Sequence, residues 1–126
     1  MNTKFVMASS AVVMGAAGLA GSFAPHELLG ALDLPASGAL PLIIQLHGTL
    51  LLAFAITNWT ARNSLIGGIY QRAIALGNLV HFVSGALTLG KFALMGGAPP
   101  AAIVATVIYA AFAIAFGVIA FGPSPQ

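Results

Sequence analysis

Residues 41–91 decide the fold of this chain, and they read PLIIQLHGTLLLAFAITNWTARNSLIGGIYQRAIALGNLVHFVSGALTLGK. Two long apolar runs flank a short polar turn centred on Ser64. Each run is long enough to cross, as a helix, the roughly 30 Å hydrocarbon core of a bilayer. His47 in the first run and His81 in the second lie at equal sequence distances from Ser64. We therefore predict two antiparallel membrane helices with both imidazoles at one depth, near the bilayer centre.

The composition agrees with a membrane protein. Of the 126 residues, 60% are hydrophobic and 5% are charged, whereas about a quarter of the residues in soluble domains are charged. The net charge of +2 comes from scattered lysines and arginines that form no basic patch, so we expect no nucleic-acid partner. The chain has no cysteine, which excludes disulfides, thiolate metal sites and thiol redox chemistry.

Two further apolar runs extend the pattern to four spans. The run at 5–23 also resembles a signal peptide, but its length favours a retained helix. Residues 24–38 hold both acidic residues, Glu27 and Asp33, and we read them as a short interfacial helix, with an irregular loop as the alternative. The sequence thus predicts a single all-α domain, residues 1–126, folded as an antiparallel up-down transmembrane four-helix bundle. Its spans are expected at about 5–23, 39–60, 69–91 and 101–121.

Basic residues predict the orientation of these spans. Lys4, Arg62 and Arg72 lie on the side of the two termini, and Lys91 lies on the opposite side. By the positive-inside rule, both termini are expected in the cytoplasm, with the chain in a bacterial inner membrane.

Small residues predict where the helices touch. Ala73, Gly77 and Gly85 form a stripe with His81 at a spacing of four residues, and Gly15 and Gly18 lie in the first span. In lipid, such residues let helix backbones approach closely. The short turn around Ser64 further predicts that the second and third spans are close antiparallel neighbours.

Polar side chains at membrane depth are confined mainly to the second and third spans. No Asp or Glu lies within any predicted span. This counts against small proton-coupled exporters, which need a carboxylate in the membrane, and against di-iron bundles, which need several glutamate ligands. The absence of cysteine excludes cysteine-based quinone oxidoreductases.

The two histidines support one specific hypothesis, a b-type haem with His47 and His81 as axial ligands. Gly48, Gly77 and Gly85 would then make room for the macrocycle, while Asn78 or Ser84 would orient an imidazole. Another tetrapyrrole, or a quinone or lipid pocket, is a further alternative. The simpler interpretation needs no cofactor, because His47 can hydrogen-bond to Asn78, and His81 to Gln45. Three aromatic residues are expected to anchor the helix ends at the interface: Trp59, Tyr70 and Tyr109.

Two segments resemble small bacterial membrane proteins of the DoxX-like kind. They are residues 25–35, PHELLGALDLP, after the first span, and residues 59–62, WTAR, at the end of the second. The resemblance implies the same four-helix fold and a role as a small membrane subunit or accessory protein. It implies no reaction.

We therefore expect a small integral-membrane subunit without catalysis of its own. It would pack against lipid and against partner membrane proteins or further copies of itself. The alternative is a haem-binding electron-transfer subunit. A transporter of a small neutral solute ranks third, since it would need a hydrated path through the bundle.

Overall fold

The computed structural model describes residues 2–64 and 69–122, and within them it is helical with no strand. The helices are α1 (Thr3–Phe23), α2 (Pro25–Ala31), α3 (Leu40–Ala61), α4 (Ile69–Leu94) and α5 (Pro100–Phe121). Among the described residues, α1, α3, α4 and α5 are long and apolar enough to cross a membrane. The predicted all-α bundle with four spans and a short helix after the first is confirmed. The chain is a multi-pass membrane protein.

Local sequence accounts for where the helices begin. Asn2 caps α1 by accepting a hydrogen bond from the Phe5 N–H at 3.2 Å. Helices α2, α3 and α5 carry proline in the first turn, where its missing N–H costs nothing: Pro25, Pro41 and Pro100. The predicted turn between the second and third spans includes residues 65–68, which lie outside the described residues.

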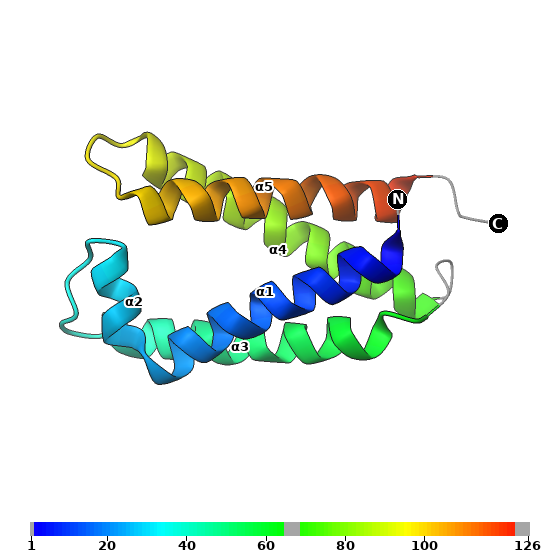
Figure 1. Ribbon diagram of the computed structural model, residues 1–126, viewed down its shortest axis with the longest axis horizontal. Helices are drawn as coiled ribbons and strands as arrows, with labels where there is room; N and C mark the ends of the chain where they lie inside the picture. Colours follow the sequence, from blue (N-terminus) through cyan, green and yellow to red (C-terminus); the bar gives the residue numbers. More distant parts are fainter. Residues whose placement is uncertain (1, 65–68, 123–126) are drawn as a thin grey trace.

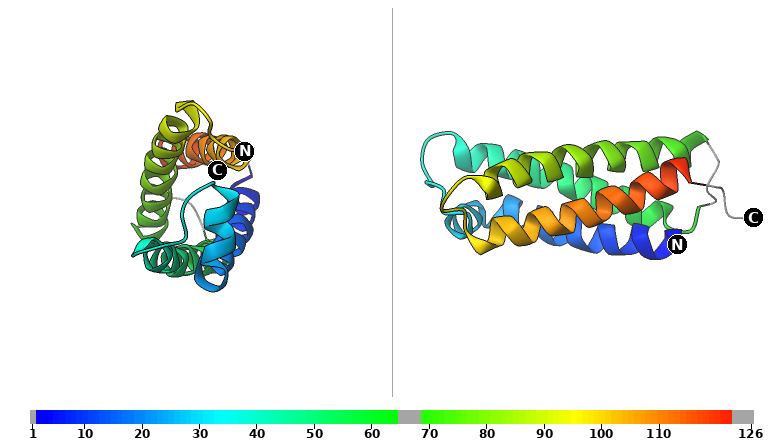
Figure 2. Two further views of the ribbon diagram at one scale, coloured as in Figure 1. Left: turned by 90° about the vertical axis from the view of Figure 1, so that its left-hand side faces the viewer. Right: turned by 90° about the horizontal axis from the view of Figure 1, so that it is seen from above.

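The bundle consists of two closely packed helix pairs. Helix α1 packs along α3, and α4 packs along α5, whereas α3 and α4 share few close backbone approaches. Figure 1 shows the two pairs as layers, with α2 at one end and the start of α1 and the end of α5 at the other. Figure 2 shows the same division along the bundle axis. The prediction that the second and third spans are the closest pair is therefore wrong, because small residues and aromatic rings decide the packing rather than the short turn.

Glycines bring α1 and α3 into contact. A Cβ added to Gly18 would lie 2.9 Å from the Gly48 carbonyl oxygen, and one added to Gly48 would lie 2.7 Å from the backbone nitrogen of Ser22. A Cβ added to Gly15 would lie 3.6 Å from the Cβ of Ala55. The two backbones meet where neither carries a side chain, which is how membrane helices gain van der Waals contact.

Aromatic rings join α4 to α5. Phe82, fully buried, lies with its ring centroid 5.6 Å from that of Phe116 and 5.0 Å from those of Phe112 and Tyr109. Gly85 leaves space for the Tyr109 ring, which lies directly against the glycine backbone. Gly77 instead faces the Phe54 ring of α3, and a Cβ added to Gly77 would lie 3.7 Å from that ring. The small residues of α4 therefore accept rings from two different helices.

An amide cluster, defined by Ser10, Asn58 and Asn78, connects the two pairs. All three side chains are fully buried. Asn58 and Asn78 exchange two amide hydrogen bonds of 2.7 Å, and Asn58 also donates to the Ser10 hydroxyl at 3.0 Å. Ser10 belongs to α1, Asn58 to α3 and Asn78 to α4. The cluster satisfies polar groups that lipid would leave unpaired, and it fixes how one helix pair sits on the other.

Replacing Asn58 with alanine should lower the free energy of unfolding by about 1–3 kcal/mol, because Asn78 and Ser10 lose a partner where water cannot replace it. The double variant N58L/N78L should cost less than the two single changes added together. Unfolding by SDS titration in mixed micelles measures both. T57V, one residue away, is the control, because the exposed Thr57 hydroxyl bonds only to the Ala53 carbonyl of its own helix. Strictly additive effects would contradict the cluster.

Candidate functional site

A cavity of about 540 Å³ lies between the helix pairs at the end of the bundle that α2 covers. All five helices contribute to its wall. We call it the histidine cavity. Its wall includes Leu32, His47, Leu51, His81, Ser84 and Tyr109. Most of its lining is apolar, and a few polar side chains gather on the α3, α4 and α5 walls. Such a pocket is the usual form of a small-molecule site.

The two histidines meet across this cavity. Their ring centroids are 6.3 Å apart and their planes are inclined by 30°. The two imidazoles therefore lie side by side. His47 lies seven residues into α3, about 10 Å from its start at the helical rise of 1.5 Å per residue. His81 lies thirteen residues from the end of α4, so one shared depth near the bilayer centre stays a prediction.

His81 is held by a residue of α5 that the sequence did not assign to the site. Its Nε2 lies 3.1 Å from the Tyr109 hydroxyl oxygen. The Phe54 ring stacks on the imidazole of His81 with the ring centroids 5.9 Å apart. The Phe82 ring meets the same imidazole edge-on with the centroids 5.0 Å apart. His81 therefore has one hydrogen-bond partner and a fixed position among three aromatic rings.

Tyr109 was predicted to be an interface anchor, and this is wrong. It lies nine residues after Pro100 and so about 13 Å into the span, which is too deep for an aromatic belt residue. Counting from the helix start would have revealed this. Trp59 does lie at a helix end, with the Arg62 guanidinium carbon 4.0 Å from its ring centroid.

His47 differs from most of the polar side chains of the spans, although the buried side chains of Ser22 and Gln71 also have no partner among the described residues. It is exposed, and no hydrogen bond joins it to any residue in the described part of the chain. By contrast, the span hydroxyls of five residues each donate to a carbonyl of their own helix: Ser9, Thr49, Thr57, Thr88 and Thr106. An unpaired imidazole N–H in hydrocarbon costs several kcal/mol, as an order of magnitude. The bundle therefore leaves one strong polar group open at the cavity.

The polar partners predicted for the histidines are corrected by the structure. Asn78 bonds to Asn58 and to the Ile74 carbonyl, so it does not reach His47. Gln45 donates to the Ser22 carbonyl of α1 at 3.5 Å, away from His81. Gln45 faces Ser22 because α3 packs on α1, whereas Asn78 does reach α3, but at Asn58 instead of His47. Ser84, the third residue of the predicted polar layer, does line the cavity.

The geometry does not fit a macrocycle between the two imidazoles. Gly48, Gly77 and Gly85 were expected to make room for it, but the α1 backbone, the Phe54 ring and the Tyr109 ring fill these places. The Nε2 of His81 bonds to Tyr109 instead of being free to ligate iron. Haem ligation by His47 and His81 therefore stays a prediction, one that this arrangement of side chains does not favour. Among the described residues, no cluster of three or more metal-ligating side chains occurs.

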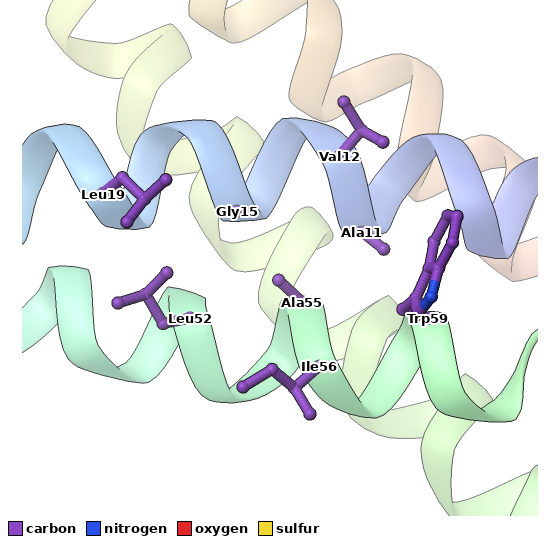
Figure 3. A pocket seen from close by; sticks show the side chains of 8 residues that line it. All are labelled: Ala11, Val12, Gly15, Leu19, Leu52, Ala55, Ile56 and Trp59. Atoms are coloured by element: carbon purple, nitrogen blue, oxygen red, sulfur yellow. The ribbon is translucent and has the colours of Figure 1, made fainter.

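A second hollow, between α1 and α3, offers no comparable chemistry. Figure 3 shows its side chains, which are apolar except for the indole nitrogen of Trp59. They include exposed residues that would face lipid, such as Val12 and Ile56. This hollow is best explained as a lipid-filled groove between two helices.

Comparisons of the chain with protein-family models, with curated proteins and with solved structures find no match. The resemblance to DoxX-like proteins therefore stays a prediction. What the site does has to be inferred from its geometry.

The His81–Tyr109 hydrogen bond predicts a measurable effect of Y109F. Losing the hydroxyl should lower the free energy of unfolding by about 1 kcal/mol and shift the imidazole ¹⁵N resonances of His81, while leaving the ring packing intact. Y70F is the matched control, because Tyr70 is 86% exposed at the start of α4. Unchanged His81 resonances in Y109F would show that the hydrogen bond does not form.

Proposed function

We propose that this chain is a small integral-membrane subunit that binds a neutral amphipathic molecule in the histidine cavity and catalyses no reaction of its own. The observation that carries this proposal is His47, a polar group that lines the cavity within a membrane span and has no hydrogen-bond partner among the described residues. A ligand head group that hydrogen-bonds to His47 would remove the cost of the unpaired imidazole. Its apolar part would fill the remaining cavity or lie in the surrounding lipid.

The chemistry of the wall favours binding over catalysis. The polar groups at the cavity are two imidazoles, a phenol and the hydroxyls of Ser84 and Thr88, and none of its lining residues is a carboxylate. The Thr88 hydroxyl donates to the Ser84 carbonyl, and no hydrogen bond among the described residues joins the Ser84 hydroxyl to His81 as an activated nucleophile would need. The site resembles a binding pocket, in which a few polar groups orient a ligand within an apolar lining.

A role among other membrane proteins is part of the same proposal. The outward faces of the four spans carry many exposed large apolar side chains, which lipid or a neighbouring protein can cover. Partner subunits and further copies of this chain are the candidate neighbours, in a bacterial inner membrane. The polar side chains in the described part of the spans are too few to line a continuous hydrated path, so a solute transporter has less support.

Purification in mild detergent, followed by organic extraction and mass spectrometry, tests the binding role. The wild-type protein should retain one amphipathic species in near-stoichiometric amount. H47L should lose most of it, because the head group loses its hydrogen-bond partner.

The control is T49V, which removes a hydroxyl two residues from His47 that bonds only to the Leu46 carbonyl. This variant should retain the ligand like the wild type. A protein with no bound species, or equal retention in H47L, would refute the binding role. A Soret band in the visible spectrum of the same sample would establish haem instead.

Cysteine labelling tests the proposed orientation, and the chain has no native cysteine to interfere. With cytoplasmic termini, a membrane-impermeant maleimide should label S37C, in the loop after α2, in intact spheroplasts. It should label S64C only after the membrane is opened. Labelling of S64C from outside would reverse the orientation and place the histidine cavity near the cytoplasmic face.

A further inference from the structure

The histidine cavity constrains the class of its ligand, and this inference rests on the binding role proposed above. None of the side chains around the cavity, all of them within the described residues, is Lys, Arg, Asp or Glu. A phosphate or carboxylate head group would lie at membrane depth without a counter-charge, which is costly in hydrocarbon. The head group must therefore be uncharged, which disfavours phospholipids and fatty acids.

The hydrogen-bonding groups of the wall require acceptors on the ligand. Neutral His47 offers one N–H. The His81–Tyr109 pair offers a second donor in either arrangement of its hydrogen bond. If the phenol donates to Nε2, the Nδ1–H of His81 remains; if Nε2–H donates to the phenol oxygen, the Tyr109 O–H remains. Two donors on different helices fit a ligand with two separate acceptor oxygens.

The shape of the wall favours a flat head group. The polar side consists of rings, with His47, His81 and Tyr109 within 6.3 Å of a neighbouring ring centroid. The side formed by α1 consists of small residues, Ala17 and Gly21. A planar ring can lie between these two walls and present oxygens at its edge. A fused saturated ring body with a single hydroxyl would leave one donor unpaired.

An apolar groove lies on the far side of the Phe54 ring from the cavity. This groove, about 310 Å³, lies between α3 and α4 and includes Phe54 and Gly77 in its lining. The Phe54 ring stacks on His81, so Phe54 separates the groove from the polar wall. A tail that passes Phe54 would lie in this groove, whose lining is apolar except for Thr57.

From these four features we infer that the ligand is a lipid-soluble quinone or its quinol. The ring oxygens accept hydrogen bonds from His47 and from the His81–Tyr109 pair, and the isoprenoid tail follows the groove beside Phe54. His47 and the His81–Tyr109 pair are then the ligand-binding groups on opposite helix pairs.

Binding of a decyl-substituted benzoquinone to the full chain in lipid nanodiscs tests this inference. Titration calorimetry should show saturable binding of about one molecule per chain. H47L should weaken it about tenfold, the loss expected from one hydrogen bond. Y109F should do the same if the phenol is the donor to the ligand, and the double variant H81L/Y109F should do so in either arrangement of the pair. H47Q, which keeps an N–H donor, should restore part of the affinity. T49V should bind like the wild type, and decylbenzene, which lacks the oxygens, should not bind saturably. Circular dichroism and thermal unfolding verify that each variant is folded.

The outcomes separate this inference from the proposed function. Absence of saturable quinone binding, together with a different neutral lipid recovered by extraction, would overturn the quinone assignment and leave the binding role intact. Quinone uptake equal in the wild type, H47L and Y109F would mean partitioning into lipid and would also overturn the assignment. Absence of any retained species and of any binding would overturn both.

Discussion

The amide cluster of Ser10, Asn58 and Asn78 is the interaction on which the arrangement of this bundle depends. The closest packing lies within each helix pair, α1 with α3 and α4 with α5. Apolar side chains facing each other in lipid gain little specificity, because the lipid tails are equally apolar. The two amide bonds of 2.7 Å between Asn58 and Asn78 are directional, and they fix the rotation of α3 and α4 toward each other. They thereby determine which faces of the two pairs meet further along the bundle.

The cavity follows from this arrangement. On α4, His81 lies three residues after Asn78, and on α3, His47 lies three helical turns from Asn58 toward α2. Near the cluster, the pairs are held by polar contacts and by buried side chains such as Met14. Toward α2, the lining changes to glycine, alanine and the two imidazoles, and the space between the pairs widens to about 540 Å³. The same two helices that close the bundle at the amides thus carry the histidines where it is open.

The sequence predicted the four spans, because these depend on the length of the apolar runs. It also singled out the two histidines whose rings lie 6.3 Å apart in the structure. It did not predict the partners of the polar side chains, because these depend on which helices pack together. The short turn suggested α3 against α4, and on that basis Asn78 was assigned to His47 and Gln45 to His81. In the structure, Gly18 and Gly48 draw α3 onto α1, so Gln45 turns toward Ser22. Buried Gln71, near the start of α4, was also missed, and it has no hydrogen-bond partner among the described residues.

The contrast between the asparagines and His47 is the strongest argument that the cavity has an occupant. A neutral histidine kept only for packing would be expected to resemble Asn58, with its polar atoms bonded to neighbouring helices. The bundle could achieve this easily, since its membrane-facing threonines already bond to their own carbonyls. Instead, His47 borders a space large enough for a ring-bearing molecule, opposite a His81 whose position Tyr109 fixes. The paired amides of the cluster and the open imidazole at the cavity divide the bundle into a part that holds the fold and a part that can hold a ligand.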